Sequence, residues 1–525
     1  MDTKALRQKI LDLAIRGKLV TQDPNDEPAS VLLERIREQK QQMFKEGKLK
    51  KKDIKNDSII FVGEDNLHYE KFADGTVKCI EDEIPFEVPE GWEWARIASV
   101  SSIVTDGEHK TPHRCENYSG YYLLSARNIQ NSFLLLDNVD YVDREEYSRI
   151  SKRCNPKRND VLISCSGSVG RVAVVEDDNH YVMVRSAAMI RFINLNPYFG
   201  MYALQSHFLQ LQIQKSSKQT AQANLFQGAI LNLLLPIPPF KAQREIAKKV
   251  SGLFKDIHEI ENEKIIIDDL LKRTKAKILD MAIRGKLVPQ NPDDEPASAL
   301  LKRIRAKKKE LVKQGKIKRD KKESIIFKGE DNSYYEKIGN KVKNIDNEIP
   351  FELPNSWTWC RGYSCFEGME SAKPQGEFFD YIDINAIDNR LHKIKEAKHL
   401  PVSDAPSRAS RSVKNGSVLF SLVRPYLENI ALVEEKYSSC IASTGFYICN
   451  SNGTFLPEFM FYLMISGYVV GGLNQYMKGD NSPSISKDNI EGWLYPVPPG
   501  KEQKAVCAKL QSVFALIESV EKSLS

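Results

Sequence analysis

Polar side chains gathered in a few loops are the first chemistry that this sequence offers. In the first half, the candidates are Lys110, Thr111, His113, Arg114, Arg127, Asn128, Ser164, Ser166, Ser168, Arg171, Lys218, Gln219, Gln222 and Asn224. In the second half, they are Lys373, Gln375, Asn385, Arg424, Tyr426, Lys478, Asn481 and Ser482. Arginine pairs with guanine, asparagine or glutamine with adenine, and serine, threonine or lysine with phosphate. Each residue alone is more often a solvated loop residue, so only their recurrence at matching places predicts a nucleic-acid surface.

Catalytic and metal-binding patterns find little support. His109, His113 and Cys115 are metal-ligand types, but the second half has no equivalent trio, so loop polarity explains them better than zinc. Gly167 and Gly170 follow an expected strand, yet a GxxG pair is too weak a signal for a phosphate loop. No GxSxG, HExxH or P-loop pattern occurs, and no acidic–lysine cluster supports a nuclease. We therefore expect no catalytic residue, cofactor or metal on this chain.

Two Pro-Pro segments, at 237–240 and 497–500, are similar to the Pro-Pro-aromatic motif of amino-methyltransferases. The polar residue needed before the prolines is Ile237 or Val497 here, and no Gly-rich cofactor loop precedes either segment. We reject a methyltransferase site and interpret each segment as a rigid entry into the first turn of a helix.

The elements that position the polar loops are duplicated. KILDLAIRGKLV at 9–20 recurs as KILDMAIRGKLV at 277–288, an offset of 268 residues (277 minus 9). NDEPAS, SIIF and EIPFE motifs recur at the same offset, and LPIPPFKAQREI (235–246) resembles YPVPPGKEQKAV (495–506). Each half is therefore a copy of the other. Because the loops diverge between the copies, we expect two sites doing the same kind of job on different targets.

Residues 241–288 connect the two copies and show a heptad seam. The seam's apolar positions are Ile246, Val250, Leu253, Ile257, Ile260, Ile267, Leu271, Ile278 and Met281, with Lys264 and Thr274 as its polar members. This spacing predicts one helix, roughly 70 Å long, that packs along a second helix. Such a helix is too long for one ordinary domain, so we expect a strut between two domains. The alternative is a long amphipathic helix lying on a single core.

The register of the copies extends this interpretation. The C-terminal helix copies the front of the strut, and the N-terminal helix copies its back. The repeat is therefore nearly circular, because joining the two termini would complete a second strut like the central one. We expect the terminal helices to lie near each other, to pair with the central helix, and to make two antiparallel struts about a pseudo-twofold axis.

The expected fold class is α+β, with curved and mainly antiparallel sheets in two duplicated globular domains separated by an antiparallel two-helix coiled coil. Lysine-rich stretches at 48–57 and 316–324 are either solvated loops or arms that face phosphates or partners, and we favour solvated loops. The expected parts are residues 1–84 (helices and a basic arm), 85–240 (first globular domain), 241–348 (strut, second helical region and basic arm), 349–498 (second globular domain) and 499–525 (helix pairing with the strut).

Composition sets the remaining limits. The 525 residues allow three or four domains, and no run of 18 apolar residues could span a membrane. The N-terminus is a charged amphipathic helix rather than a secretory signal, and nine cysteines without a CxxC pair suit a reducing cytosol. The net charge of +6 permits an anionic partner without establishing one. We expect a cytoplasmic protein without membrane contact.

Over essentially its whole length the sequence resembles the specificity subunit of type I restriction-modification systems. The resemblance rests on AIRGKLV and IPFE twice each, on DGEHKTP, LLSARNI and DVLISCSGSVGRVAVV, and on the two Pro-Pro helix entries. DGEHKTP looks like the DNA-proximal loop of that family, which adds Asp106, Gly107, His109 and Pro112 to the candidates. The second half departs from the pattern, with MESAKPQG and SLVRPYLENIALV at the corresponding places.

The resemblance implies that 85–240 and 349–498 are target-recognition domains, each reading one half of a split double-stranded DNA target. It implies a non-catalytic subunit that seats two adenine-methyltransferase subunits, which bind S-adenosylmethionine, and that recruits restriction subunits, which use ATP and Mg. Two other hypotheses remain open. A coiled-coil scaffold would show no sequence-dependent retention on a random DNA pool, and a fused nuclease would cleave DNA by itself with a metal.

Overall fold

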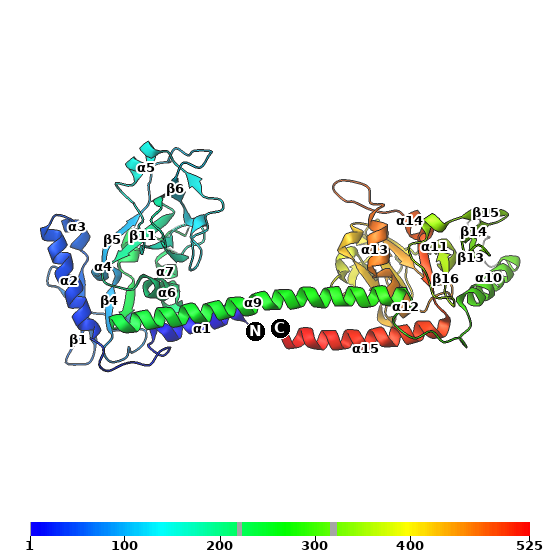
Figure 1. Ribbon diagram of the computed structural model, residues 1–525, viewed down its shortest axis with the longest axis horizontal. Helices are drawn as coiled ribbons and strands as arrows, with labels where there is room; N and C mark the ends of the chain where they lie inside the picture. Colours follow the sequence, from blue (N-terminus) through cyan, green and yellow to red (C-terminus); the bar gives the residue numbers. More distant parts are fainter. Residues whose placement is uncertain (1, 218–222, 316–322, 525) are drawn as a thin grey trace. The chain divides into compact units, whose positions relative to one another are not determined.

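The computed structural model describes residues 2–217, 223–315 and 323–524. The chain forms two compact units, Met1–Glu263 and Lys264–Ser525, and each contains both helices and sheets (Figure 1). The 44-residue helix α9 (Phe240–Ile283) contributes its first part to one unit and its last part to the other. Among the described residues, no helix combines the length and apolarity needed to cross a membrane.

The first unit begins with helices and a small sheet. These elements are α1 (Thr3–Ile15), α2 (Ala29–Lys45), α3 (Lys51–Ile54), β1 (Ser58–Val62), β2 (His68–Phe72), β3 (Val77–Cys79) and the 3-10 helix η1 (Glu81–Glu83). Gly17 follows α1 with a φ of +65°, and a Cβ there would lie 2.3 Å from Cγ of Pro89. The lysine-rich stretch at 48–57, expected as a loop, contains α3, and its copy at 316–322 lies outside the described residues.

The globular part of the first unit follows. Its elements are β4 (Glu93–Arg96), α4 (Ile97–Val100), β5 (Ser101–Asp106), β6 (Tyr121–Leu124), η2 (Ala126–Asn128), β7 (Asp140–Tyr141), α5 (Arg144–Ile150), β8 (Val161–Ser164), β9 (Val172–Val174), β10 (His180–Met183), β11 (Ala187–Phe192), α6 (Pro197–Gln205), α7 (His207–Ser217), α8 (Gln227–Leu231) and β12 (Leu234–Ile237). One antiparallel sheet has the order β5-β11-β8-β9, and a second has the order β10-β6-β7. The segment MYALQSHFLQLQI is split between two helices, because the chain turns at Ser206, whose hydroxyl donates to the Ala203 carbonyl.

The second unit also contains a small three-stranded sheet followed by a globular part, but the elements of its globular part differ from those of the first. Its elements are α10 (Ala297–Lys313), β13 (Ser324–Lys328), β14 (Tyr334–Ile338), β15 (Lys341–Asn344), η3 (Asp346–Glu348), β16 (Thr358–Arg361), α11 (Gly362–Cys365), β17 (Phe378–Ile382), η4 (Ile384–Ala386), β18 (Ile387–Asp388), β19 (Lys393–Ile394), β20 (Lys398–Pro401), η5 (Val402–Asp404), β21 (Ala409–Ser412), β22 (Val418–Ser421), η6 (Pro425–Leu427), β23 (Ile430–Leu432), η7 (Glu435–Tyr437), β24 (Ile441–Ser443), β25 (Phe446–Cys449), α12 (Pro457–Met464), α13 (Gly467–Asn474), α14 (Lys487–Gly492), β26 (Leu494–Val497) and α15 (Gly500–Leu524).

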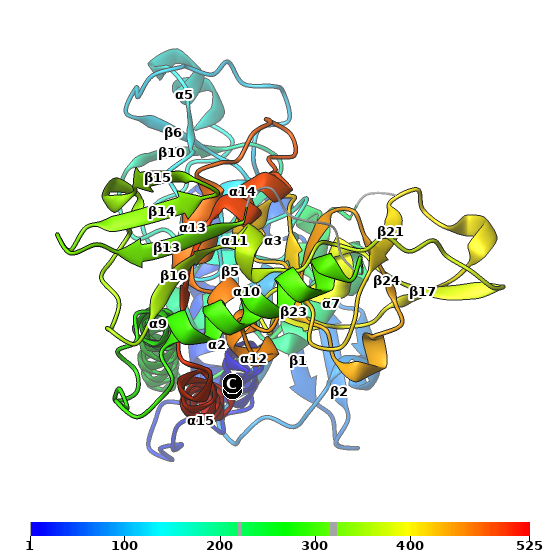
Figure 2. The same cartoon turned by 90° about the vertical axis from the view of Figure 1, so that its right-hand side faces the viewer.

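Strand pairing is mainly antiparallel in both units, as expected, with one parallel exception in each. In the first unit β10 runs parallel to β6, and in the second β24 runs parallel to β17. The sequence did not predict these parallel pairs, because the residues of two short apolar strands far apart in sequence do not indicate the relative direction of the strands. The β13-β14-β15 sheet is visible as three adjacent green arrows in Figure 2.

The two ends of each globular part meet in a strand pair that leads into a helix. β4 pairs with β12 before α9, and β16 pairs with β26 before α15. After each Pro-Pro segment a buried glutamine closes the turn: Gln243 donates to the Pro238 carbonyl at 2.9 Å, and Gln503 to that of Pro498 at 3.2 Å. The glutamine of the repeated motif therefore satisfies the backbone where the prolines interrupt it.

Each terminal helix packs along the part of α9 that belongs to its own unit (Figure 1). In the first unit Arg7 of α1 donates to Glu261 at 2.7 Å, and its guanidinium lies over the Phe254 ring. In the second unit Lys275 donates to Glu521 of α15 at 2.9 Å. The seam positions near the start of α9 are buried, whereas Ile260 is 46% exposed.

Candidate nucleic-acid interface

The turn between β10 and β11 is the point at which the candidate loops of the first unit meet. The Ser186 hydroxyl accepts a hydrogen bond from the Ala126 amide at 3.1 Å, and the Ser186 carbonyl accepts one from the Cys165 amide at 2.7 Å. The amide of Arg185 donates to the Glu108 carbonyl at 3.0 Å. Three loops that lie far apart in sequence are therefore bonded to two adjacent residues.

The fourth polar loop joins the same place. Asn224 pairs with Ser166 as an isolated bridge, and the Leu225 amide donates to the Cys165 carbonyl at 2.8 Å. The predicted candidates Lys218, Gln219 and Gln222 lie outside the described residues. Within the described part, all four loops of the first unit thus converge on one region.

The DGEHKTP loop is pressed closely against this turn. A Cβ on Gly107 would lie 2.4 Å from the Met183 carbonyl oxygen, so only glycine permits this approach. Asp106 is bonded to Arg153 and, at 2.7 Å, to Nε2 of His109. Gly107, Asp106 and His109 therefore shape the loop, and their polar groups are already engaged within the chain.

Two glutamates fasten the same loop to α5. Glu108 and Glu146 accept hydrogen bonds from Arg149 at 2.9 and 2.8 Å, and Glu146 also accepts from the His113 amide. The hydrogen bonds from Arg149 lower the pKa of Glu146 to about 2. The Glu146 carboxylate is therefore ionised at neutral pH, and its hydrogen bonds with Arg149 and the His113 amide hold the loop in position.

The accessible tip of the loop carries the remaining candidates. Lys110, Thr111, His113 and Arg114 are all exposed. Arg114 and Arg127 both donate to Asp140, at 2.9 and 2.6 Å, so one carboxylate aligns two guanidinium groups from different loops. Their remaining N–H groups can donate to phosphates or base edges.

Two residues predicted to bind DNA lie beneath the loop, with their side chains engaged inside the chain. Asn128 is only 2% exposed; its side-chain oxygen accepts from the Ser125 amide, and its nitrogen donates to the Leu135 carbonyl. Arg171 donates to Gln130 and to the Ala126 carbonyl. These contacts make Asn128 and Arg171 supports of the loop that carries Arg127. The buried Ser164 likewise bonds the turn through the Ser168 carbonyl, whereas Ser166 and Ser168 are accessible.

The sequence analysis missed Arg185, which lies at the centre of this region. Its side chain is exposed, and it has no ion-pair or hydrogen-bond partner among the described residues. Arg185 lies between two buried strands, in VMVRSAAMI. A charged residue between two apolar runs indicates a turn whose side chain faces solvent, and this pattern could have identified Arg185.

The second unit repeats the convergence around its corresponding turn. The Leu422 amide donates to the Gly445 carbonyl at 2.8 Å, and the Thr444 amide donates to that of Arg408 at 2.8 Å. A Cβ on Gly445 would lie 3.0 Å from Ile384 of η4, the element that contains the exposed Asn385. The loop after β22, the loop before β21 and the η4 segment therefore meet at the β24–β25 turn.

The predicted residues of the second unit lie in the loop after β22, in η4, in the loop at 478–482 that contacts it, and in a separate stretch at 373–375. Ser484 bridges both Val423 and Lys478, and Arg424 donates to the Asn481 carbonyl at 3.0 Å. Lys373 and Gln375 lie in a separate stretch that pairs with β21 through Ser371 and Arg411. The eight predicted residues, all exposed, are Lys373, Gln375, Asn385, Arg424, Tyr426, Lys478, Asn481 and Ser482.

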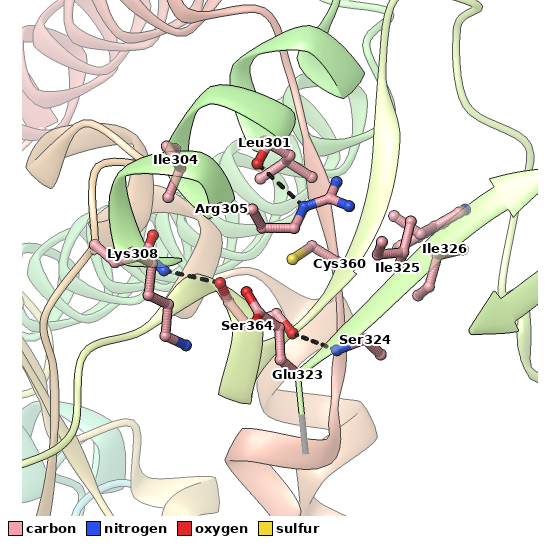
Figure 3. Close-up of a pocket in the computed structure, with 12 residues that line it drawn as sticks. Leu301, Ile304, Arg305, Lys308, Glu323, Ser324, Ile325, Ile326, Cys360 and Ser364 are labelled. Atoms are coloured by element: carbon pink, nitrogen blue, oxygen red, sulfur yellow. Dashed lines mark hydrogen bonds between the residues drawn. The ribbon is translucent and has the colours of Figure 1, made fainter. Parts of the chain in front are cut away.

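A small cavity in the second unit lies between α10 and β13 (Figure 3). Its volume is about 10 Å³, which is room for about one water molecule. Arg305 donates to the Leu301 carbonyl at 3.1 Å, and the Ser364 hydroxyl accepts from the Ser324 amide at 3.1 Å. The cavity is too small for a ligand. Among the described residues, no group of three or more His, Cys, Asp or Glu side chains is arranged to bind a metal ion.

Comparison with known proteins agrees with these features. Residues 89–267 match the model of the type I restriction modification DNA specificity domain. The specificity subunit of the type I restriction enzyme EcoAI of Escherichia coli is 25% identical, over 97% of this chain and 89% of its own length. This chain carries the type I DNA specificity domain and is similar to a type I specificity subunit over nearly its whole length. The EcoEI specificity subunit of Escherichia coli is also 25% identical, over 99% of this chain and 90% of its own length.

The fold of this chain also matches a solved structure. A chain from a structural study of assembly and conformational transition in the type I R-M system aligns with a TM-score of 0.54. The two chains are 15% identical, and the alignment covers 84% of this chain and 94% of the other. At that identity the match concerns the fold alone. The family model covers the first set of loops, and the two relatives extend the family resemblance across the second set as well.

Proposed function

We propose that this chain is the sequence-specific DNA-binding subunit of a type I restriction-modification complex. Residues 85–240 would read one half of a bipartite double-stranded DNA target, and residues 349–498 the other half. The observation that carries this proposal is the repeated convergence of polar loops on the β10–β11 and β24–β25 turns. The loops that meet at the two turns carry different side chains, which suits two readers of different sequences.

The proposed interface contains exposed and partly exposed members of these loops and leaves the supporting residues out. In the first unit it consists of Lys110, Thr111, His113, Arg114, Arg127, Ser166, Ser168, Arg185 and Asn224, with Lys218, Gln219 and Gln222 from the undescribed stretch. In the second unit it consists of Lys373, Gln375, Arg408, Arg424, Tyr426, Lys478, Asn481 and Ser482. Asp106, Gly107, His109, Asn128 and Arg171 act by positioning these loops.

We further propose that the two halves are duplicated and that α9 forms an antiparallel coiled coil with the terminal helices. The contacts of α1 with the first part of α9, and of α15 with its last part, support this arrangement. The proposed parts keep the sequence boundaries: 1–84, 85–240, 241–348, 349–498 and 499–525.

The proposed subunit is non-catalytic and cytoplasmic. It seats two methyltransferase subunits, which bind S-adenosylmethionine, and works with restriction subunits that use ATP and Mg. The family relationship supports this role, because the relatives named above are the specificity subunits of restriction enzymes.

The proposal is tested by mapping methylated adenines in cells that contain this chain and its partner subunits. We expect one bipartite motif whose first half changes when residues 90–235 are exchanged for those of another recognition domain. Arg185→Ala should relax or weaken recognition in the same half by about 1–3 kcal/mol if it contacts a base, or reduce the salt dependence of binding by about one unit of slope if it contacts a phosphate. Methylation without any common motif, together with no sequence-dependent retention on a random DNA pool, would favour the scaffold hypothesis.

A further inference from the structure

The outer face of the β1-β2-β3 sheet is apolar and exposed. Its residues follow the register of the strands: Ile59 lies opposite Lys71, Lys71 opposite Val77, and Phe61 opposite Tyr69. Ile59, Phe61 and Val77 are 37%, 40% and 53% exposed, and the Phe61 and Tyr69 rings stack at 5.9 Å. An apolar face across three strands is unusual on a solvated surface and often marks a binding site.

The second unit presents the same face. Ile325 lies opposite Lys337, Lys337 opposite Val342, and Phe327 opposite Tyr335. Ile325, Phe327 and Val342 are 38%, 41% and 53% exposed, and the two rings again stack at 5.9 Å. The recognition loops diverged between the two halves, whereas this face kept its residue types and its exposure.

The sheet is attached to the rest of its unit through the opposite, inner face. The inner face is fastened by Ile60 and by the ion pair of Glu70 with Arg96, and in the second unit by Ile326 and the ion pair of Glu336 with Arg361. The outer residues Phe61 and Phe327 contribute to neither set of contacts. Exposed aromatic and aliphatic residues without a structural task are typical of protein interfaces.

The charge at the centre of each face indicates what could cover it. Lys71 and Lys337 stand on the middle strand, and neither ammonium group has a hydrogen-bond or ion-pair partner among the described residues. A protein partner that supplies a carboxylate there would pair with the lysine while its apolar side chains cover the surrounding residues. DNA fits less well, because one lysine is a small counter-charge and the adjacent β-turns carry Glu64, Asp65 and their copies.

We propose that each face docks one methyltransferase subunit, so that two equivalent faces bind two copies of the same partner. The inference rests on the proposed function, which supplies a partner present in two copies per chain. Each face is smaller than a complete stable interface, so it acts as an anchor within a larger contact. Loss of one anchor should weaken binding of one copy by roughly 30-fold.

The test measures stoichiometry. The full chain is produced with the methyltransferase subunit of its own system, and the complexes are weighed by native mass spectrometry. At subunit concentrations at which a roughly 30-fold loss of affinity empties a site, the unchanged chain should bind two copies, whereas Phe61→Thr with Lys71→Glu, or Phe327→Thr with Lys337→Glu, should bind one. All four changes together should bind none. Threonine retains the strand preference of the exposed position, so the sheet should persist.

Three controls separate docking from folding. Lys71→Arg keeps the positive charge, so this variant should still bind two methyltransferase subunits. Lys71→Glu alone should weaken the binding of one subunit. Ile103→Thr, an exposed strand residue outside the face, should leave the stoichiometry at two. Thermal unfolding of each chain confirms that the variants are folded.

The other outcomes are distinct. If the unchanged chain binds no methyltransferase subunit, the proposed function is wrong. If it binds two copies and every folded variant still binds two, the docking inference is wrong while the proposed function stands. If the variants bind two copies but lose DNA affinity or self-association, the faces serve DNA or a second copy of this chain, and the inference is equally overturned.

Discussion

Arg96 of β4 forms an ion pair with Glu70 of β2, with Nη2 2.7 Å from Oε2 and the two side chains only 11% and 4% exposed. Arg361 and Glu336 repeat the pair in the second unit at 3.1 Å, with 13% and 7% exposure. In each unit the pair attaches the small sheet to the strand that opens the globular part. The arginine also donates to a second carboxylate, Glu83 or Glu348.

Removal of this arginine should be costly. Arg96→Ala leaves the Glu70 carboxylate buried without its counter-charge, and we expect the free energy of unfolding of the first unit to fall by about 3–5 kcal/mol. Urea unfolding measures the change. Arg37→Ala is the matched control, because its pair with Glu34 is exposed and should contribute less than about 1 kcal/mol. Equal effects of the two substitutions would show that the buried pair has no special role.

The stability of the first recognition loop should depend on pH through Glu146. Its hydrogen bonds from Arg149 lower the pKa from the ordinary 4.5 to about 2 in the folded chain. A carboxyl with a lowered folded pKa stabilises the fold above its unfolded pKa and loses that contribution as pH falls from about 4.5 to about 2. Glu146→Gln should therefore be less stable at pH 7 and lose less stability on acidification. Unfolding midpoints between pH 7 and pH 2.5 measure this, and parallel profiles for the two proteins would contradict it.

Gly107 should tolerate no side chain. Gly107→Ala places a Cβ against the Met183 carbonyl and must displace the loop that carries Lys110 and Thr111. We expect DNA affinity in the first half-site to fall at least tenfold, together with a loss of stability of about 1–3 kcal/mol. In Gly228→Ala the new Cβ meets no atom within 4 Å, and this control should retain both affinity and stability.

Arg424 combines a possible base contact with an unusual backbone. Its φ is +48°, in the left-handed region, where a side chain costs about 1 kcal/mol and glycine costs nothing. Arg424→Gly should therefore keep the turn while losing recognition in the second half-site, whereas Arg424→Ala should lose the same recognition with no gain in backbone freedom. Methylation motifs and urea unfolding of both variants check this. Recognition that is altered in the first half-site would contradict the assignment of Arg424 to the second.

The contrast between Lys110 and Asn128 shows how far the sequence reaches. Both are polar residues in loops, and both were predicted to contact nucleic acid. Lys110 is exposed, whereas the amide of Asn128 is enclosed by Ser125 and Leu135. Residue type identifies a polar loop, but whether its side chain faces solvent depends on neighbours that the pattern does not contain.

Arg185 shows the reverse case. It follows an apolar run, and no motif marks it, yet the β10–β11 turn places it among four loops. The parallel pairing of β10 with β6 brings the turn to this position, and that pairing joins segments about 60 residues apart. The break between α6 and α7 is likewise invisible in the helical periodicity, since Ser206 ends α6 by a local hydrogen bond.

The sequence by itself determined the repeat, the long helix α9, the mainly antiparallel α+β character and the family, because periodicity, turn residues and motifs are properties of short segments of chain. The tertiary structure decided which polar residues remain exposed, which ones support the loops, and how the loops converge on one turn in each unit. Those features depend on hydrogen bonds and burial between segments that are distant in sequence, so no local pattern could specify them.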